Sequence, residues 1–213
     1  AALFGWFAVR LSGVYLAMLT LALAQIVWSV VFQWDDFTGG SNGLVGIWPS
    51  AWLSDKVAYY YLTLVATVVG VVLLRRMLFS PFGYAMRAGR DSPLRADAIG
   101  IDVIRVHWAA FIVAGLFGGL GGVLFAFSKG SISPDVMAIG RSIDGLVMVL
   151  LGGVHTLSGP IVGATALTWL QDTVARETEY WRAMLGIIIL VLVMLFPMGI
   201  AGALKQSLVR SEP

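Results

Sequence analysis

Long apolar runs constrain this chain more than any other feature of its sequence. Four of them, at residues 11–32, 57–79, 108–127 and 183–204, have the length of about 20 residues that a helix needs to cross a ~30 Å hydrocarbon layer. Hydrophobic residues make up 59% of the 213 residues and charged residues only 12%, too few charges to cover a soluble core of that size. The sequence therefore excludes a soluble globular domain and a disordered chain, and it predicts an all-α, polytopic transmembrane helical bundle.

Two shorter apolar runs, at residues 142–154 and 161–174, flank a stretch rich in Gly and containing Pro at 152–160. The first run can cross the bilayer only as a short or tilted helix, or it enters as a half-helix that breaks inside the protein. We predict that it crosses. The expected architecture is one domain over residues 1–213 with about six crossings, one of them short or broken.

The distribution of Lys and Arg predicts the orientation. Nine of the 14 basic residues fall on the side that carries the loop at about residues 80–106, and five fall on the other side. Because short cytoplasmic loops are enriched in Lys and Arg, this loop is predicted to be cytoplasmic.

Small residues recur every three or four positions in the run at 108–127, and Gly115, Gly118, Gly119 and Gly122 share one helix face. In lipid, such a face lets helix backbones approach closely. We expect it to pack inside the bundle; a homodimer seam is the alternative.

The cytoplasmic loop carries the signals of a short helix at residues 93–99. Ser92 precedes Pro93 at its start, and Gly100 stands where a C-terminal glycine belongs. A capped helix between two spans is either a docking element or a solvated connector, and the residue pattern leaves both open.

Polar groups inside the apolar runs are few, and intramembrane polar groups point to function by default. Gln25 lies in the middle of a run, and Ser142 and Asp144 begin the short one. For Gln25, the alternative to substrate contact is a hydrogen bond to another helix. For Asp144, the alternative is a cap of its helix at the membrane interface. The broken stretch, with Gly152, Gly153 and Gly159, is the candidate lining of a translocation path, because half-helix ends solvate charged groups with backbone dipoles.

The sequence contains no phosphate-binding P-loop, no Gly-rich dinucleotide loop, no nucleophile elbow and no paired intramembrane carboxylates. It has no cysteine, and its two histidines lack partners at metal-ligand spacing. The basic residues form no nucleic-acid footprint. We therefore expect no catalytic residue, no metal, no cofactor and no nucleic-acid partner.

Several motifs in order carry a resemblance that covers nearly the whole chain. They are YLAMLTLALAQIVWSVV, the TGGSNGL loop, RAGRDSPLRADAIGI, GRSIDGLVMVLLGGVHTLSGPIVGA and FPMGIAG. Together they resemble the inner-membrane permeases of branched-chain amino acid ABC importers, and the M-type permease more than the H-type. Members of that family carry further N-terminal transmembrane helices, so relative to the family we expect this chain to be N-terminally incomplete.

The resemblance implies a multi-pass protein of the bacterial inner membrane. The expected partners are the lipid bilayer, a second permease subunit, two ATP-binding subunits and a periplasmic substrate-binding protein. It also implies that the loop docks on an ATP-binding subunit as a coupling helix. The residues that this assignment covers are Arg87, Ala88, Arg90, Asp91, Ser92, Arg95, Ala96 and Gly100.

The expected function is the permease subunit of an ATP-driven importer of branched-chain or related amino acids, with ATP hydrolysis in a partner subunit. One alternative is a secondary transporter or channel that works without ATP. Another, inside the family, is import of urea or short amides. Neither the packing motifs nor the apolar composition identifies the substrate.

Overall fold

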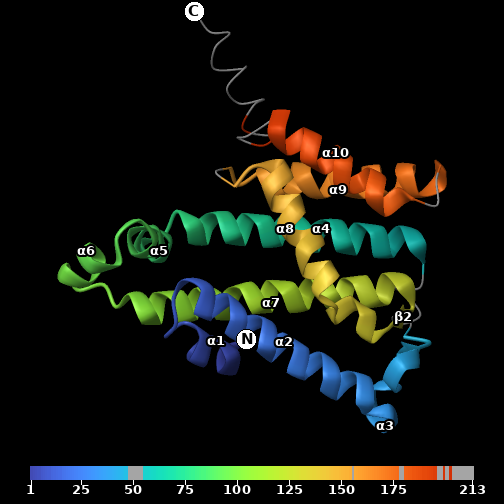
Figure 1. The fold of residues 1–213 in the computed structure, drawn as a ribbon, viewed down its shortest axis with the longest axis horizontal. Helices are drawn as coiled ribbons and strands as arrows, with labels where there is room; N and C mark the ends of the chain where they lie inside the picture. The colour runs from blue at the N-terminus through green and yellow to red at the C-terminus, as the bar shows by residue number, and fades with distance from the viewer. Residues whose placement is uncertain (48–54, 155, 178–179, 196–198, 200–201, 203–213) are drawn as a thin grey trace, which may run out of the picture. The chain divides into compact units, whose positions relative to one another are not determined.

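The computed structural model describes residues 1–47, 55–154, 156–177, 180–195, 199 and 202. The chain divides into two compact units, Ala1–Met137 and Ala138–Pro213. Both are built of helices, as Figure 1 shows, so the predicted all-α membrane bundle is confirmed.

The first unit alternates long helices with short connecting elements. In chain order they are α1 (Ala2–Ala8), α2 (Gly13–Gln33), α3 (Asp35–Thr38), η1 (Gly40–Asn42), β1 (Leu44–Val45), α4 (Lys56–Leu78), α5 (Pro81–Asp91), α6 (Pro93–Ala98), α7 (Val103–Lys129), β2 (Ser131–Ile132) and η3 (Pro134–Met137).

Among the described residues of this unit, three helices are long and apolar enough to cross a membrane: α2, α4 and α7. Their apolar cores match the predicted runs, but α7 begins five residues before the predicted start at 108. The Asp102 carboxylate explains the difference, because it accepts a hydrogen bond from the Arg105 backbone N–H at 3.0 Å and so caps an earlier first turn. At its other end α7 stops at Gly130, which adopts the left-handed conformation.

The three spans are joined by few but specific contacts. The Tyr59 hydroxyl of α4 donates to the Leu124 carbonyl of α7 at 2.5 Å, and Gly70 lies against the Phe117 ring. At the ends where α2 and α7 finish, β1 pairs antiparallel with β2, Leu44 opposite Ile132. Sequence reasoning did not predict this pair. It ties the loop after α2 to the end of α7.

The second unit contains α8 (Ile139–Gly152), α9 (Gly159–Glu177) and α10 (Trp181–Leu195). The short predicted run at 142–154 is thus a helix of 14 residues that starts slightly earlier, and the run at 161–174 lies inside a helix of 19 residues. The last predicted run, 183–204, is helical through residue 195, and most of its remaining residues lie outside the described part of the chain. That the short helix crosses the bilayer, and that the crossings number six, stay predictions.

Candidate functional site

The loop that is predicted to be cytoplasmic folds into two helices, α5 and α6, between the end of α4 and the start of α7, as Figure 1 shows. We call residues 81–99, which comprise the two helices and the C-cap of α6, the α5–α6 elbow. Sequence reasoning predicted α6 but missed α5, although Ser80 and Pro81 repeat the Ser-Pro signal that precedes α6.

The turn from α4 into α5 is tight and braced. A Cβ on buried Gly83 would overlap the Leu78 carbonyl, so the two helices approach as closely as backbone allows. The Arg87 guanidinium donates to that same carbonyl at 3.3 Å and lies 5.5 Å from the ring centroids of both Phe79 and Tyr84. A cation at the carbonyl end of a helix is stabilising. Arg87 therefore holds the elbow to the end of α4.

The far end of α5 packs against the start of α7. Gly89 is buried, and a Cβ there would lie 3.1 Å from the Val103 side chain and 3.4 Å from the His107 ring. Ala88 is half-buried beside it. Small residues at these two positions let α5 lie close to α7.

Gly100 stops helix α6, as the sequence predicted, but the helix ends at residue 98 and the prediction was 99. Gly100 has φ of +84°, its N–H donates to the Asp97 carbonyl at 2.9 Å, and the Ile101 N–H donates to the Ala96 carbonyl at 3.0 Å. This pair of bonds is the Schellman arrangement, which requires the left-handed conformation that glycine adopts without strain. Ser92 occupies the predicted N-cap position, but its hydroxyl makes no capping hydrogen bond.

Burial separates the elbow residues into two groups. Ala96 is 2% exposed, so it packs within the chain and presents no surface to a partner. Arg90, Asp91 and Arg95 are exposed, with an Arg90–Asp91 ion pair at 3.0 Å. Two apolar side chains on α6 and its C-cap, which the sequence pattern did not single out, are also exposed: Leu94 at 87% and Ile99 at 74%. The exposed surface of the elbow therefore consists of an apolar tip, Leu94 and Ile99, together with the charged side chains of Arg90, Asp91 and Arg95.

The glycines of the predicted broken stretch are packing positions. Gly152 and Gly153 lie at the end of α8 and are buried, as is Gly159 at the start of α9. A Cβ on Gly152 would overlap the Gly159 carbonyl, and a Cβ on Gly159 would overlap the Gly153 carbonyl. These three glycines therefore let α8 and α9 meet backbone to backbone. That they line a translocation path stays a prediction.

The predicted polar candidates belong to different units of the chain, and each is described in its own surroundings. Gln25 is exposed, on the face of α2 away from Thr20 and Leu23, which help line an apolar cavity of about 330 Å³. Ser142 is exposed on α8, and the Asp144 carboxylate lies 4.0 Å from Arg141, one helical turn away. Within the described ranges, no group of three or more His, Cys, Asp or Glu side chains is arranged to hold a metal ion.

The glycine face of α7 is mostly open. A Cβ on Gly115 would overlap Ala1, so this position does pack against the chain. A Cβ on Gly118, Gly119 or Gly122 would meet no atom of the described structure within 4 Å beyond its own helix and neighbours. Gly115 thus packs within its own unit, and the packing of the other three inside the bundle stays a prediction, because helix periodicity identifies a face and not what covers it.

Comparison of the sequence with known proteins gives one family match and several relatives. The family model described as branched-chain amino acid transport system, permease component, matches residues 1–193. The high-affinity branched-chain amino acid transport permease LivM of Salmonella typhimurium is 28% identical, covering 97% of this chain and 55% of the relative, and LivM of Escherichia coli gives the same values. The guanosine ABC transporter permease NupQ of Bacillus subtilis is 33% identical over 46% of this chain and 31% of its own length.

The chain spans about half the length of the LivM relatives it matches. No solved structure matches it. The family match covers nine-tenths of the chain, including α2, α4, the elbow and α7, and the apolar helices suit an inner-membrane protein. The chain belongs to the family of branched-chain amino acid transport system permease components of the inner membrane.

Proposed function

We propose that this chain forms part of the permease of an ATP-driven importer of branched-chain or related amino acids, and that the α5–α6 elbow couples it to an ATP-binding subunit. The family match and the LivM relatives support the transport class. The observation that carries the coupling role is the elbow itself, a braced pair of short helices that exposes apolar Leu94 and Ile99 between two membrane spans.

A coupling element must transmit force, so it must be stiff where it meets the spans and adhesive where it meets the partner. The elbow has both properties. Arg87 and Gly83 join it to α4, and Gly89 joins it to α7. Buried Ala96 anchors α6, which leaves its apolar tip exposed. Motion of a partner that grips this tip would reach α4 and α7 together.

The chemistry of the tip indicates what the partner surface offers. Leu94 and Ile99 require an apolar groove, and Arg90, Asp91 and Arg95 require a polar rim that sets orientation. The complete importer would contain a second permease subunit, two ATP-binding subunits and a periplasmic substrate-binding protein. Because this chain has no P-loop, ATP hydrolysis falls to the ATP-binding subunits.

Co-purification with the ATP-binding subunit of the same importer tests the coupling role. Leu94→Asp should abolish co-purification, because it places a charge in an apolar groove. Reversing the charges of Arg90, Asp91 and Arg95 together should weaken it. The matched control is Val45→Asp on β1, which is 80% exposed and lies beyond the opposite end of α7. Retention of the subunit by Leu94→Asp, with Val45→Asp also unaffected, would overturn the docking surface.

Uptake into vesicles tests the substrate class and the energy source. The full-length importer should take up labelled leucine only with ATP inside, and unlabelled isoleucine and valine should compete. Guanosine, L-arabinose and urea, added in excess, test the other substrates, since relatives named as guanosine and L-arabinose permeases occur among the matches. Uptake that persists without ATP and stops when an ionophore collapses the ion gradient would instead establish the secondary transporter.

A further inference from the structure

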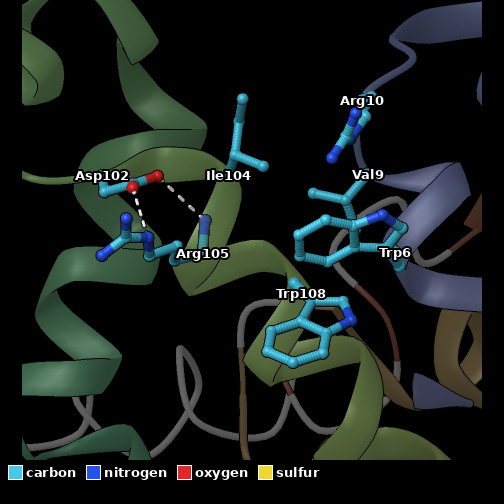
Figure 2. Close-up of a pocket in the computed structure, with 7 residues that line it drawn as sticks. All are labelled: Trp6, Val9, Arg10, Asp102, Ile104, Arg105 and Trp108. Carbon is cyan, nitrogen blue, oxygen red and sulfur yellow. Dashed lines mark hydrogen bonds and ion pairs between the residues drawn. The ribbon is translucent and has the colours of Figure 1, made fainter. Parts of the chain in front are cut away.

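A cavity of about 160 Å³ lies between α1 and the first turns of α7. Figure 2 shows Trp6, Val9 and Arg10 on the α1 side and Asp102, with the first two turns of α7, on the other. Its volume is roughly ten times the 10–15 Å³ that one water molecule requires. The cavity therefore admits a group the size of a phosphate.

The walls of this cavity are held in place by α1 packing on α7. The Trp108 indole N–H donates to the Ala2 carbonyl at 2.9 Å, and the Trp6 and Trp108 rings meet edge to face at 5.7 Å. Gly5 lies so close that a Cβ there would be 2.8 Å from the Phe111 ring. The two indoles thus form a wall whose position is set by a hydrogen bond and by close packing.

The cavity carries a positive charge that the described residues do not neutralise. The Arg10 guanidinium lies 4.7 Å from the Trp6 ring centroid, and no carboxylate of the described chain lies within ion-pair distance of it. The carboxylate that lines the cavity, Asp102, is engaged by the Arg105 guanidinium at 2.9 Å. Two arginines and one aspartate line the cavity, so its net charge is about +1. The Arg10 guanidinium is the cation that no described carboxylate pairs with.

The order of residues along α7 places the cavity at the membrane boundary. Charged Asp102 and Arg105 precede Trp108, and the apolar part of the span follows. Tryptophan prefers the headgroup level of a bilayer, and arginine at the end of a span reaches the same level. The anions at that level are phosphates of lipid headgroups.

We propose that this cavity binds the phosphate of an anionic phospholipid headgroup, with Arg10 as the main ligand and the indoles of Trp6 and Trp108 as its walls. The planar guanidinium suits a phosphate because it donates two parallel hydrogen bonds. Basic pockets between helices at the membrane surface recognise such headgroups. Bound lipid would fasten α1 to the start of α7.

Native mass spectrometry of the delipidated full-length protein tests the site with defined probes. The probes are phosphatidylglycerol, phosphatidylcholine of the same acyl chains, and inorganic phosphate. Arg10→Gln removes the charge, and Arg10→Lys keeps the charge without the planar fork. The matched control is Arg76→Gln, an exposed arginine in the last turn of α4 that lines none of the cavities described here. Circular dichroism and size-exclusion chromatography establish that each variant is folded.

The wild-type protein should retain phosphatidylglycerol in preference to phosphatidylcholine. Arg10→Gln should lower its affinity for phosphatidylglycerol about fivefold, the effect of one basic residue near a charged headgroup. The affinity of Arg10→Lys for phosphatidylglycerol should lie between the affinities of the wild type and Arg10→Gln. The affinity of Arg76→Gln should equal that of the wild type. Should Arg10→Gln not fold, the preference of the wild type should still decline with added salt.

Two results would overturn the proposal. One is equal retention of phosphatidylglycerol by Arg10→Gln and wild type. The other is an Arg10-dependent affinity for inorganic phosphate as high as for the lipid, which would assign the site to a free anion in the cytoplasm or periplasm. Neither result depends on the transported substrate or on the ATP-binding subunit.

Discussion

Gly163 of α9 faces the carbonyl oxygen of Met148 of α8 so closely that a Cβ would overlap it. Gly152, which is adjacent to Gly163, stands in the same relation to the Gly159 carbonyl. Leu151 of α8 and Leu167 of α9 are both buried. The α8–α9 hairpin therefore depends on backbone-to-backbone contact, which is the way that helices gain van der Waals energy in lipid.

Gly163→Val should destabilise the protein severely. Its side chain would collide with backbone, which no change of rotamer relieves, and the cost should exceed the 1–3 kcal/mol typical of overpacked cores. Thermal unfolding in detergent, followed by size-exclusion chromatography, measures it. Gly145→Ala is the control, because a Cβ on this α8 residue meets nothing within 4 Å beyond its own helix and neighbours. Equal melting temperatures for the two variants would contradict the close crossing.

Tyr59→Phe should loosen α4 from α7. The variant removes the hydroxyl that donates to the Leu124 carbonyl and keeps the ring. The expected loss is about 1 kcal/mol, the usual net value of such a bond between membrane helices. Unfolding by SDS in bicelles provides the measurement. Tyr60→Phe, one residue along and exposed, should leave the stability unchanged; a similar loss in both variants would speak against a specific α4–α7 bond.

Gly100→Val should unfold the end of α6. A side chain at φ of +84° costs about 1–2 kcal/mol, and relaxing that strain breaks the bonds from Gly100 and Ile101. Hydrogen exchange over residues 93–101 should become faster while exchange in α7 stays slow. Ala98→Val adds the same side chain two residues earlier, at an exposed helical position, and should change exchange little. Unchanged protection in Gly100→Val would show that the glycine stop is not needed.

Arg87→Gln should free the elbow from α4. The substitution removes the donor to the Leu78 carbonyl and the cation over two aromatic rings. We expect faster hydrogen exchange at residues 78–84 and weaker ATP-driven uptake with the docking of the ATP-binding subunit retained. Arg90→Gln removes an exposed ion pair worth at most about 1 kcal/mol and should leave exchange at 78–84 unchanged. Loss of docking in Arg87→Gln would contradict its role as an internal brace.

Of the two elbow helices, α6 could be predicted from the sequence and α5 could not. The Ser-Pro start and Gly stop of α6 are local signals, because capping geometry is set within a few residues, and they located that helix within one residue. Helix α5 carries the same Ser-Pro start but contains Gly83 and Gly89, which lower helix propensity. Packing against Leu78 and Val103 requires those glycines, and that requirement is visible only once the chain has folded.

The amino-acid sequence is sufficient to derive the medium in which this protein folds and its fold class. Run length and hydropathy identify lipid as the medium, because a helix has a fixed rise and a bilayer a fixed thickness. The tertiary structure decided which small residues are covered. Gly118 and Gly163 stand in similar glycine-rich surroundings, yet one is open and the other touches a carbonyl. Helical periodicity selects a face of a helix, whereas the atoms opposite that face come from residues distant in the chain, which no local pattern specifies.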